Sequence, residues 1–295
     1  MIPPRVILVP VDFSDPSRTA LLFAARLARQ TGAALHVLHA QEPLLAEGAR
    51  VAGFDLARDT EDELGRFLAA ASLPSETAPH LHVATGPAVD VIVHTAERLE
   101  ADVIVVGSHG MSGAERIVFG STTEGLLRRA PSSVLVTPAL WSPARSGVPD
   151  LSGTGPVIAA VDFSAAAVEA AKAACRLASA LKTTLEIVHV VPELPVLVRW
   201  RGHAEAAVRD RAAAARQQLD TVAVSVACGV PMEVNVGTGA VANRLADAAA
   251  SSSSRRPILV LGRRAPGEKG GSPGSTAYRV LMLAKVPVLM HVADE

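Results

Sequence analysis

The chain contains one sequence pattern twice, and this internal repeat constrains its fold more than any other feature. VDFS at 11–14 returns as VDFS at 161–164, and LHVLHA at 35–40 corresponds at the same offset to LEIVHV at 185–190. Further matches, TGPAV with TGAV and DVIVVG with PILVLG, follow in the same order in both halves. Matches in a common order indicate a tandem duplication, so both halves are expected to fold in the same way.

The length and composition suit two domains of the α/β class. At 295 residues the chain is longer than a typical domain of ~100–200 residues. Hydrophobic residues make up 49% of the chain and aromatic residues only 3%, so the cores must consist of Ala, Val, Leu and Ile, as in parallel sheets covered by helices. A stretch rich in Pro, Gly and Ser at 139–155 is typical of a linker. We predict one domain at 1–140 and a second at 155–295.

Short apolar runs alternate with helical patterns in the first half. Runs bounded by Gly, Pro, Asp or Ser are typical of buried strands, and apolar residues three or four apart are typical of helices. Strands that alternate with helices predict a right-handed, parallel α/β sheet. The expected strands are 6–11, 34–40, 80–84, 101–107 and 132–138, and the expected helices are 14–30, a longer segment within 45–72, 88–99 and 121–130.

A glycine-rich stretch between the fourth strand and the next helix is the main candidate for ligand binding. Gly107 ends the strand, Gly110 follows, and Gly120 and Ser121 begin the helix after nine further residues. Glycines let the backbone approach a ligand closely, and a helix N-terminus attracts phosphate. The competing interpretation is a tight turn with Ser121 as the helix cap. The stretch is neither a Walker A loop nor a G-x-G-x-x-G fingerprint. No lysine precedes Lys172, so backbone amides, hydroxyls or arginine would have to hold phosphate.

Three features together resemble the universal stress protein family. They are VPVDFSD at 9–15, the G-x2-G-x9-G-S spacing that begins at Gly107, and APSSVLVTP at 130–138. The resemblance covers essentially the whole chain as two family domains in tandem. For each domain it implies a Rossmann-like, adenine-nucleotide-binding fold with five parallel strands in the order 3-2-1-4-5, flanked by helices. It also implies ATP or AMP at the carboxyl ends of the strands, between the first strand and the glycine loop.

The resemblance also implies the binding residues of the first domain. Val11 and Asp12 would border the adenine and ribose, and Ala40 would lie beside the base. ATP is the expected ligand, and Mg²⁺ could accompany it, but no residue is expected to be a dedicated metal ligand. The ribose and phosphates would contact Gly107, Ser108, Gly110, Gly120, Ser121 and Thr122.

The second half departs from this pattern. Gly262 is followed by Arg-Arg-Ala, so the second glycine is missing, and the interval to the last glycine is one residue shorter. Two interpretations stay open: this domain binds a second nucleotide, or it only replaces the second subunit of a family homodimer. Both predict an intramolecular pseudo-dimer, and two tandem chains could associate further. The equivalents that keep their places are Asp162, Gly262, Gly274, Ser275 and Thr276.

The remaining polar candidates are interpreted as structural. Asp12 and Asp162 have no Ser or His at triad-like spacing, so neither is expected to be a general base. His39 and His189 repeat at equivalent strand positions, and we expect them to be hydrogen-bonded near the end of the sheet. Three further histidines alternate within strands without carboxylate or cysteine partners, which does not favour a metal site: His36, His80 and His82.

The cysteines, the charge and the apolar runs predict a cytoplasmic protein. Cys175 and Cys228 fit no metal or redox spacing, so we expect no disulfide, an inert Cys175 on a core-facing helix, and a reducing compartment. The N-terminus lacks the pattern of a signal peptide, and no apolar run approaches the ~20 residues of a membrane span. A net charge of −1, with basic pairs that lack interleaved aromatics, argues against membrane and nucleic-acid partners.

The leading hypothesis for function is an ATP-binding stress-response or regulatory protein. Nucleotide occupancy of the first domain would set its conformation or its contacts with a partner. The first alternative is a slow ATP hydrolase or phosphotransfer enzyme; the missing Walker lysine and the lack of an acid–base pair argue against it. The second alternative is a nucleotide-free interaction scaffold in which both glycine stretches are only turns. Resemblance of fold does not by itself decide among the three.

Overall fold

The computed structural model describes residues 3–71, 73, 77–108, 120–138, 155–193, 201–226, 228–251, 257–263 and 274–293. The chain divides into two compact units. The N-terminal unit comprises Ile2–Leu151, and the C-terminal unit comprises Ser152–Glu295 together with Met1. The predicted linker lies outside the described residues, except for Gly155.

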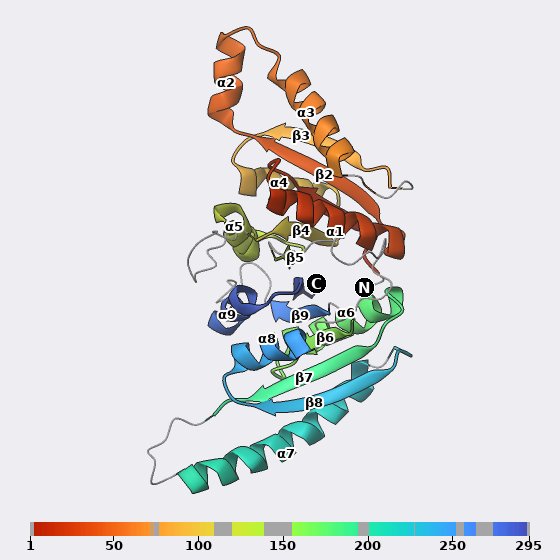
Figure 1. The fold of residues 1–295 in the computed structure, drawn as a ribbon, viewed down its shortest axis with the longest axis vertical. Coiled ribbons are helices and arrows are strands. Elements are labelled where there is room, and N and C mark those ends of the chain that lie inside the picture. Colours follow the sequence, from red (N-terminus) through yellow and green to blue (C-terminus); the bar gives the residue numbers. More distant parts are fainter. Residues whose placement is uncertain are drawn as a thin grey trace. The chain divides into compact units, whose positions relative to one another are not determined.

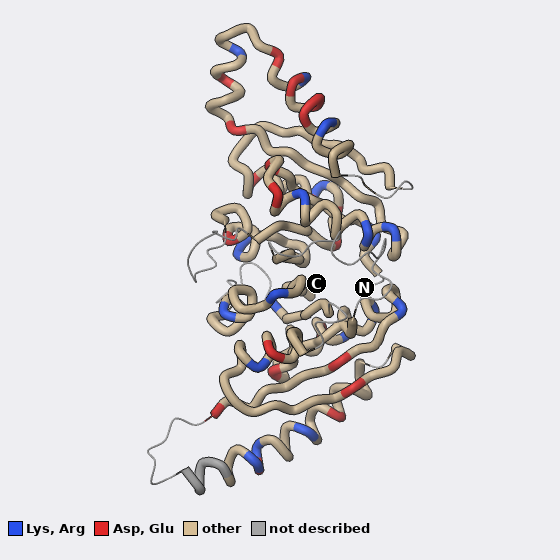
Figure 2. The backbone as a smooth tube through the Cα atoms, viewed as in Figure 1, with Lys and Arg blue, Asp and Glu red and all other residues tan. Residues whose placement is uncertain are grey.

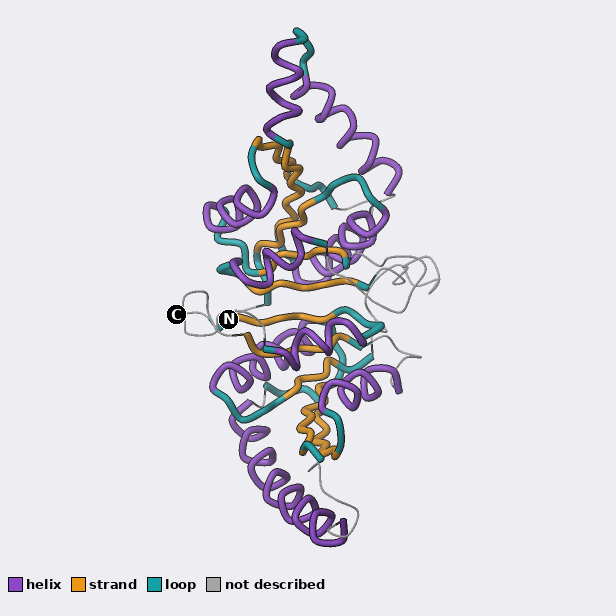
Figure 3. The backbone as a smooth tube through the Cα atoms, turned by 90° about the vertical axis from the view of Figure 1, so that its left-hand side faces the viewer, coloured by secondary structure: helices purple, strands orange, loops and turns teal. Residues whose placement is uncertain are grey.

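The N-terminal unit is a parallel sheet with helices on both faces (Figures 1 and 3). Its strand order is β3-β2-β1-β4-β5, and every adjacent pair is parallel. This confirms the predicted fold class and strand order. The strands are β1 (Val6–Pro10), β2 (Ala34–Gln41), β3 (His80–Thr85), β4 (Val103–Gly107) and β5 (Ser133–Thr137), and the helices are α1 (Asp15–Thr31), α2 (Pro43–Val51), α3 (Leu56–Ala71), α4 (Ala88–Arg98) and α5 (Ser121–Arg129).

The C-terminal unit repeats this architecture. Its strands are also parallel, in the order β8-β7-β6-β9-β10, with β6 in the place of β1. The repeat in the sequence is therefore a repeat of the fold. The strands are β6 (Val157–Ala160), β7 (Leu185–Val191), β8 (Met232–Thr238), β9 (Ile258–Arg263) and β10 (Val288–Val292), and the described helices are α6 (Ala165–Ala180), α7 (Arg201–Val226), α8 (Val241–Ser251) and α9 (Ser275–Leu283).

The two units differ in the connection between their second and third strands. The sequence predicted one longer helical segment within 45–72, whereas the N-terminal unit has two helices, α2 and α3. The chain turns between them at Gly53, whose φ of 68° lies in the left-handed region that favours glycine. In the described part of the same connection, the C-terminal unit has the 26-residue α7. None of the helices in the described ranges is long and apolar enough to cross a membrane.

Aliphatic side chains form the core, and the helix ends follow local signals. Ile7, Leu8 and Val9 of β1 are fully buried. Helix α1 begins where its N-cap Ser14 accepts a hydrogen bond from a first-turn N–H, and it ends at Gly32, whose φ is 72°. Because all strands run the same way, the carboxyl ends of β1, β2 and β4 meet at one edge of the sheet.

The fourth strand of each unit passes close to the first turn of the unit's first helix. A Cβ atom at Gly107 would lie 2.5 Å from the carbonyl oxygen of Pro16 in α1. At Gly262 it would lie 2.5 Å from the carbonyl oxygen of Ala166 in α6. A side chain fits at neither strand end unless the helix moves, so both halves need glycine there.

The two cysteines form a disulfide, so the prediction of none is wrong. Cys175 lies in α6 and Cys228 lies between α7 and β8, with 6.1 Å between their Cα atoms. They are 53 residues apart in the sequence, and the chain returns to α6 only after the whole of α7. Spacing along the sequence does not reveal such a pair, because the fold alone brings the two positions together.

We expect the Cys175–Cys228 bond to stabilise the C-terminal unit by about 2–4 kcal/mol, because it constrains the unfolded chain. Urea unfolding of the wild type with and without reductant measures this contribution. Cys228→Ser should unfold like the reduced wild type and should not respond to reductant. Equal stability of the oxidised and reduced wild type would contradict the expectation.

We expect Gly107→Ala to lower the free energy of unfolding by about 1–3 kcal/mol, the usual cost of overpacking. The reason is the 2.5 Å approach to the carbonyl oxygen of Pro16. Gly48→Ala is the matched control: it lies in α2, its added Cβ meets nothing within 4 Å, and it should be neutral or stabilising. Thermal unfolding of both variants tests this, and equal stability of the two would show that the strand end tolerates a side chain.

Candidate functional site

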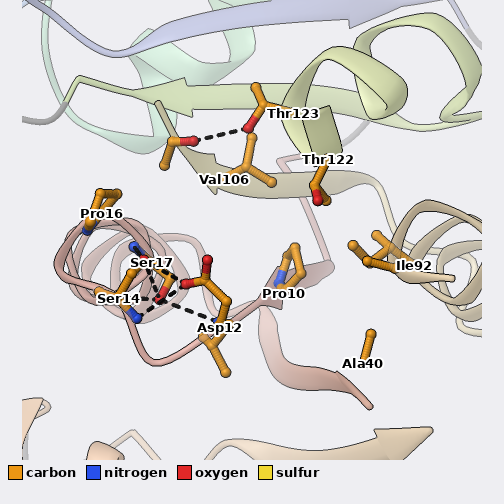
Figure 4. A pocket seen from close by; sticks show the side chains of 13 residues that line it. Pro10, Asp12, Ser14, Pro16, Ser17, Ala40, Ile92, Val106, Thr122 and Thr123 are labelled. Atoms are coloured by element: carbon orange, nitrogen blue, oxygen red, sulfur yellow. Dashed lines mark hydrogen bonds between the residues drawn. The ribbon is translucent and has the colours of Figure 1, made fainter. Parts of the chain in front are cut away.

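A pocket of about 100 Å³ lies at the carboxyl ends of β1, β2 and β4 in the N-terminal unit (Figure 4). The loop after β1, the first turn of α1, the end of β2, α4, the end of β4 and the start of α5 all contribute to its wall. Its position is the one at which parallel α/β sheets bind ligands. The lining residues are Pro10, Val11, Asp12, Ser14, Pro16, Ser17, Ala40, Ala88, Ile92, Val106, Gly107, Thr122 and Thr123.

The structure brings five of the predicted binding residues together at this pocket. They come from three strand ends and one helix N-terminus, far apart in the sequence. The five are Val11, Asp12, Ala40, Gly107 and Thr122.

The other predicted residues of the first half lie beside the pocket or outside the described residues. Ser108 is buried, and its N–H donates to the carbonyl oxygen of Thr137 at 2.9 Å. Gly120 and Ser121 form the N-terminus of α5 and are not among the residues that line the pocket. Gly110 lies outside the described residues.

The side chains of the loop after β1 hold it in one conformation. A carboxylate oxygen of Asp12 accepts hydrogen bonds from the N–H of Ser14 at 3.1 Å and from its hydroxyl at 2.5 Å (Figure 4). The Ser14 oxygen accepts from the N–H of Ser17 at 3.3 Å. Phe13, within this loop, has a φ of 63°, which is costly for a bulky residue. The loop therefore presents Asp12 to the pocket in a defined orientation.

A histidine of β2 supports this loop from the side. His39 Nδ1 lies 2.9 Å from the carbonyl oxygen of Val11, and since a carbonyl only accepts, Nδ1 carries the proton. The ring stacks on Phe13, with 4.5 Å between the ring centroids. The expectation of a hydrogen-bonded histidine near the sheet end is confirmed. Its contacts help to offset the unfavourable backbone angle of Phe13.

The N-cap residue of α5, beside the pocket, is a glycine and supplies no side-chain cap. This residue is Gly120, so Ser121 does not cap the helix as the turn interpretation assumed. The hydroxyl of Thr123 donates to the carbonyl oxygen of Gly107 at 3.0 Å and ties α5 to the end of β4. The first-turn N–H groups and the positive end of the helix dipole lie at the pocket, where they attract an anion.

The C-terminal unit keeps the loop after its first strand. The carboxylate of Asp162 accepts from the N–H of Ser164 at 3.0 Å and from its hydroxyl at 2.5 Å. Phe163 has a φ of 65°, and its ring centroid lies 4.5 Å from that of His189. His189 Nδ1 lies 2.7 Å from the carbonyl oxygen of Val161. The loop after the first strand, with its Asp, Phe and supporting His, therefore has the same structure in both halves.

The end of β9 and the start of α9 differ from the equivalent positions in the N-terminal unit. Gly274 is the N-cap of α9, followed by Ser275 and Thr276, and all three are exposed. Arg263 stands where the first half has Ser108; it is 2% exposed, and burial lowers its pKa to about 10. Ala277 stands where the first half has Thr123, so no hydroxyl is available at that position to bind the strand end.

Sequence reasoning missed several pocket residues because they reach the site only through packing. Pro16 and Ser17 belong to the first turn of α1, whose position against β4 is not encoded locally. Ala88 and Ile92 are one helical turn apart, so they lie on the same face of α4. Their spacing in the sequence was the signal that could have indicated a shared surface. Thr123 directly follows the predicted Thr122.

Basic and acidic residues are interspersed along the helices (Figure 2), and some of them form ion pairs. Arg128 lies 2.7 Å from Glu124, and Arg129 lies 2.5 Å from Asp90. In the part of the chain that the structure describes, no group of three or more His, Cys, Asp and Glu side chains is arranged to hold a metal ion.

Comparison with known proteins matches the same two regions. The model of the universal stress protein family matches residues 4–138 and 154–291. A universal stress protein A homolog of Coxiella burnetii is 34% identical over 137 residues, which are 44% of this chain and 92% of that protein. A universal stress protein of Methanocaldococcus jannaschii is 29% identical over 137 residues, which are 45% of this chain and 81% of that protein.

The fold as a whole also has a solved counterpart. A universal stress protein from Archaeoglobus fulgidus is similar over 98% of both chains, with a TM-score of 0.64 and 19% sequence identity. At that identity the likeness bears on the fold alone. Since the two family matches together span most of the sequence, this chain belongs to the universal stress protein family and carries two family domains in tandem.

Proposed function

We propose that the N-terminal unit binds ATP in the pocket beside Gly107, and that the protein is a stress-response regulator whose conformation or partner contacts depend on this occupancy. The observation that carries the proposal is the meeting of three groups at one pocket. They are the carboxylate of Asp12, the glycine end of β4 and the N-terminus of α5, whose N-cap residue is a glycine.

Each part of ATP has a chemically suited neighbour in this pocket. Val11, Ala40 and Ile92 offer apolar surface to the base. The carboxylate of Asp12 accepts hydrogen bonds from ribose hydroxyls. The N-terminus of α5, with the hydroxyl of Thr122, holds phosphate without a lysine. An accompanying Mg²⁺ would be bound chiefly by phosphate oxygens and water.

The C-terminal unit is, in this proposal, a counterpart that does not bind nucleotide. It lacks the second glycine, and the buried side chain of Arg263 replaces the small Ser108. A guanidinium that is 2% exposed is not accessible to an incoming phosphate. This unit then supplies what a second subunit supplies in a homodimer, so a single chain could act alone.

A cytoplasmic location is part of the same proposal. Thiols in the cytosol are mostly kept reduced. The bond between Cys175 and Cys228 would therefore form there chiefly under oxidising conditions.

Calorimetric titration of the full chain with Mg-ATP tests the proposal, and we expect about one site per chain. Asp12→Ala should weaken binding by about 10- to 100-fold, because a hydrogen bond to a charged group is lost. The matched Asp162→Ala in the other unit should leave affinity unchanged. Gly120→Val and Gly274→Val form a second matched pair. The first should weaken binding, and the second should leave affinity unchanged.

Each other result has a defined meaning. Two sites, with affinity lost in Asp162→Ala or Gly274→Val, would contradict a non-binding C-terminal unit. No heat and no thermal shift with ATP would overturn the nucleotide proposal and favour a scaffold. Steady-state ATP turnover that disappears in Asp12→Ala would instead favour the hydrolase alternative.

A further inference from the structure

Three histidines form a cluster where β2 pairs with β3, outside the pocket described above. His36 is in register with His80 on the neighbouring strand. Nδ1 of His36 lies 2.9 Å from Nε2 of His82, within hydrogen-bond distance. The ring of His36 stacks on both others, with centroid distances of 4.8 Å to His80 and 5.2 Å to His82. The three rings therefore form one cluster across two strands, with His36 in contact with both others.

The cluster lies at the outer edge of the sheet of the N-terminal unit. β3 is the outermost described strand of this unit at that edge, and it pairs with β2. The face that carries His36 also carries Ala40, because strand residues four apart point the same way. The opposite face is covered by α3, where the side chain of Gln41 donates to the hydroxyl of Thr60 at 2.8 Å.

Helix α4 connects the cluster with the pocket. Ala88 and Ile92, in its first turns, line the pocket. Arg98, in its last turn, acts electrostatically on both His36 and His82. A change of charge at the histidines therefore changes their electrostatic interaction with Arg98, on the helix that also forms part of the pocket wall.

The hydrogen bond inside the cluster requires at least one neutral ring. One imidazole nitrogen must donate while the other accepts, and two protonated rings would oppose N–H to N–H. Burial first, then the charges of His82, His80 and Arg98, lowers the pKa of His36. Burial first, then Arg98 and His80, lowers the pKa of His82. The charged groups that lower the pKa values of His36 and His82 are themselves basic side chains, so protonation adds repulsion.

We propose that His36, His80 and His82 form a proton-sensitive latch that holds β3 on β2 at neutral pH and releases it in mildly acidic solution. Release loosens the β3–α4 connection and with it the pocket wall at Ala88 and Ile92. The latch itself is independent of any ligand. Only its effect on nucleotide affinity rests on the proposed function.

The direction of the pH effect follows from the two lowered pKa values. The unfolded or released rings bind protons near the ordinary pKa of about 6.5, whereas the latched rings bind them only at lower pH. Stability of the latch is therefore constant above about pH 6.5 and is lost as pH falls through the lowered pKa values.

Hydrogen exchange of the full chain at about pH 7.5 and about pH 5 tests the latch. We expect the protection factors of the β3 amides to fall by about 10-fold or more at the lower pH, while those of β1 and β4 change little. The double variant His36→Asn, His82→Gln keeps polar side chains of similar reach but does not titrate, and it should lose this pH dependence. His94→Gln, at an exposed histidine of α4, is the matched control and should behave like the wild type.

The outcomes separate the latch from the nucleotide proposal. Protection factors in β3 that do not change with pH, or that change equally in the double variant, overturn the latch. If the double variant does not fold, imidazole NMR titration of the wild type decides. His36 and His82 must titrate below the ordinary value of about 6.5, and midpoints at that value overturn the latch. ATP affinity should fall several-fold more between the two pH values in the wild type than in the variant. Absence of ATP binding at both pH values refutes the proposed function and leaves the exchange result standing.

Discussion

The close approach of the fourth strand to the first turn of the first helix sets the geometry on which the pocket depends. Because Gly107 has no side chain, the strand end reaches the carbonyl group of Pro16, and β1, α1 and β4 come together at one corner. Thr123 then ties α5 to the same strand end. The C-terminal unit keeps this contact at Gly262, which indicates that the contact is a requirement of the fold.

The two halves share this scaffold and differ in elements attached to it. The strand-end loop with its strained phenylalanine and its supporting histidine is present in both units. The groups that would meet phosphate differ, since a buried Arg263 replaces Ser108. The helices after the second strand differ as well, because α2 and α3 are replaced by α7, and Cys228, between α7 and β8, forms a disulfide with Cys175 of α6. The two halves thus share the sheet and differ at the end of the fourth strand and in the helices after the second strand.

In the N-terminal unit, β2 and α4 both extend from the pocket to the histidine cluster. Ala40 and His36 lie on one face of β2, the first at the pocket and the second in the histidine cluster. Helix α4 runs between the same two places, from Ala88 to Arg98. A rigid helix with one end at each group is a simple physical means by which protonation at one end can change ligand affinity at the other.

The sequence by itself determined the duplication, the parallel sheets, the strand order through the family resemblance, and the strand-end positions Asp12 and Gly107, because periodicity, turn residues and glycine act locally. Only the tertiary structure decided which distant residues meet. Ile92 at the pocket, the pairing of Cys175 with Cys228, and the contact of His36 with His82 all depend on helix and strand placement rather than on spacing along the chain. Local rules say where a helix or strand begins, whereas packing against the rest of the core decides which of its faces meets which neighbour.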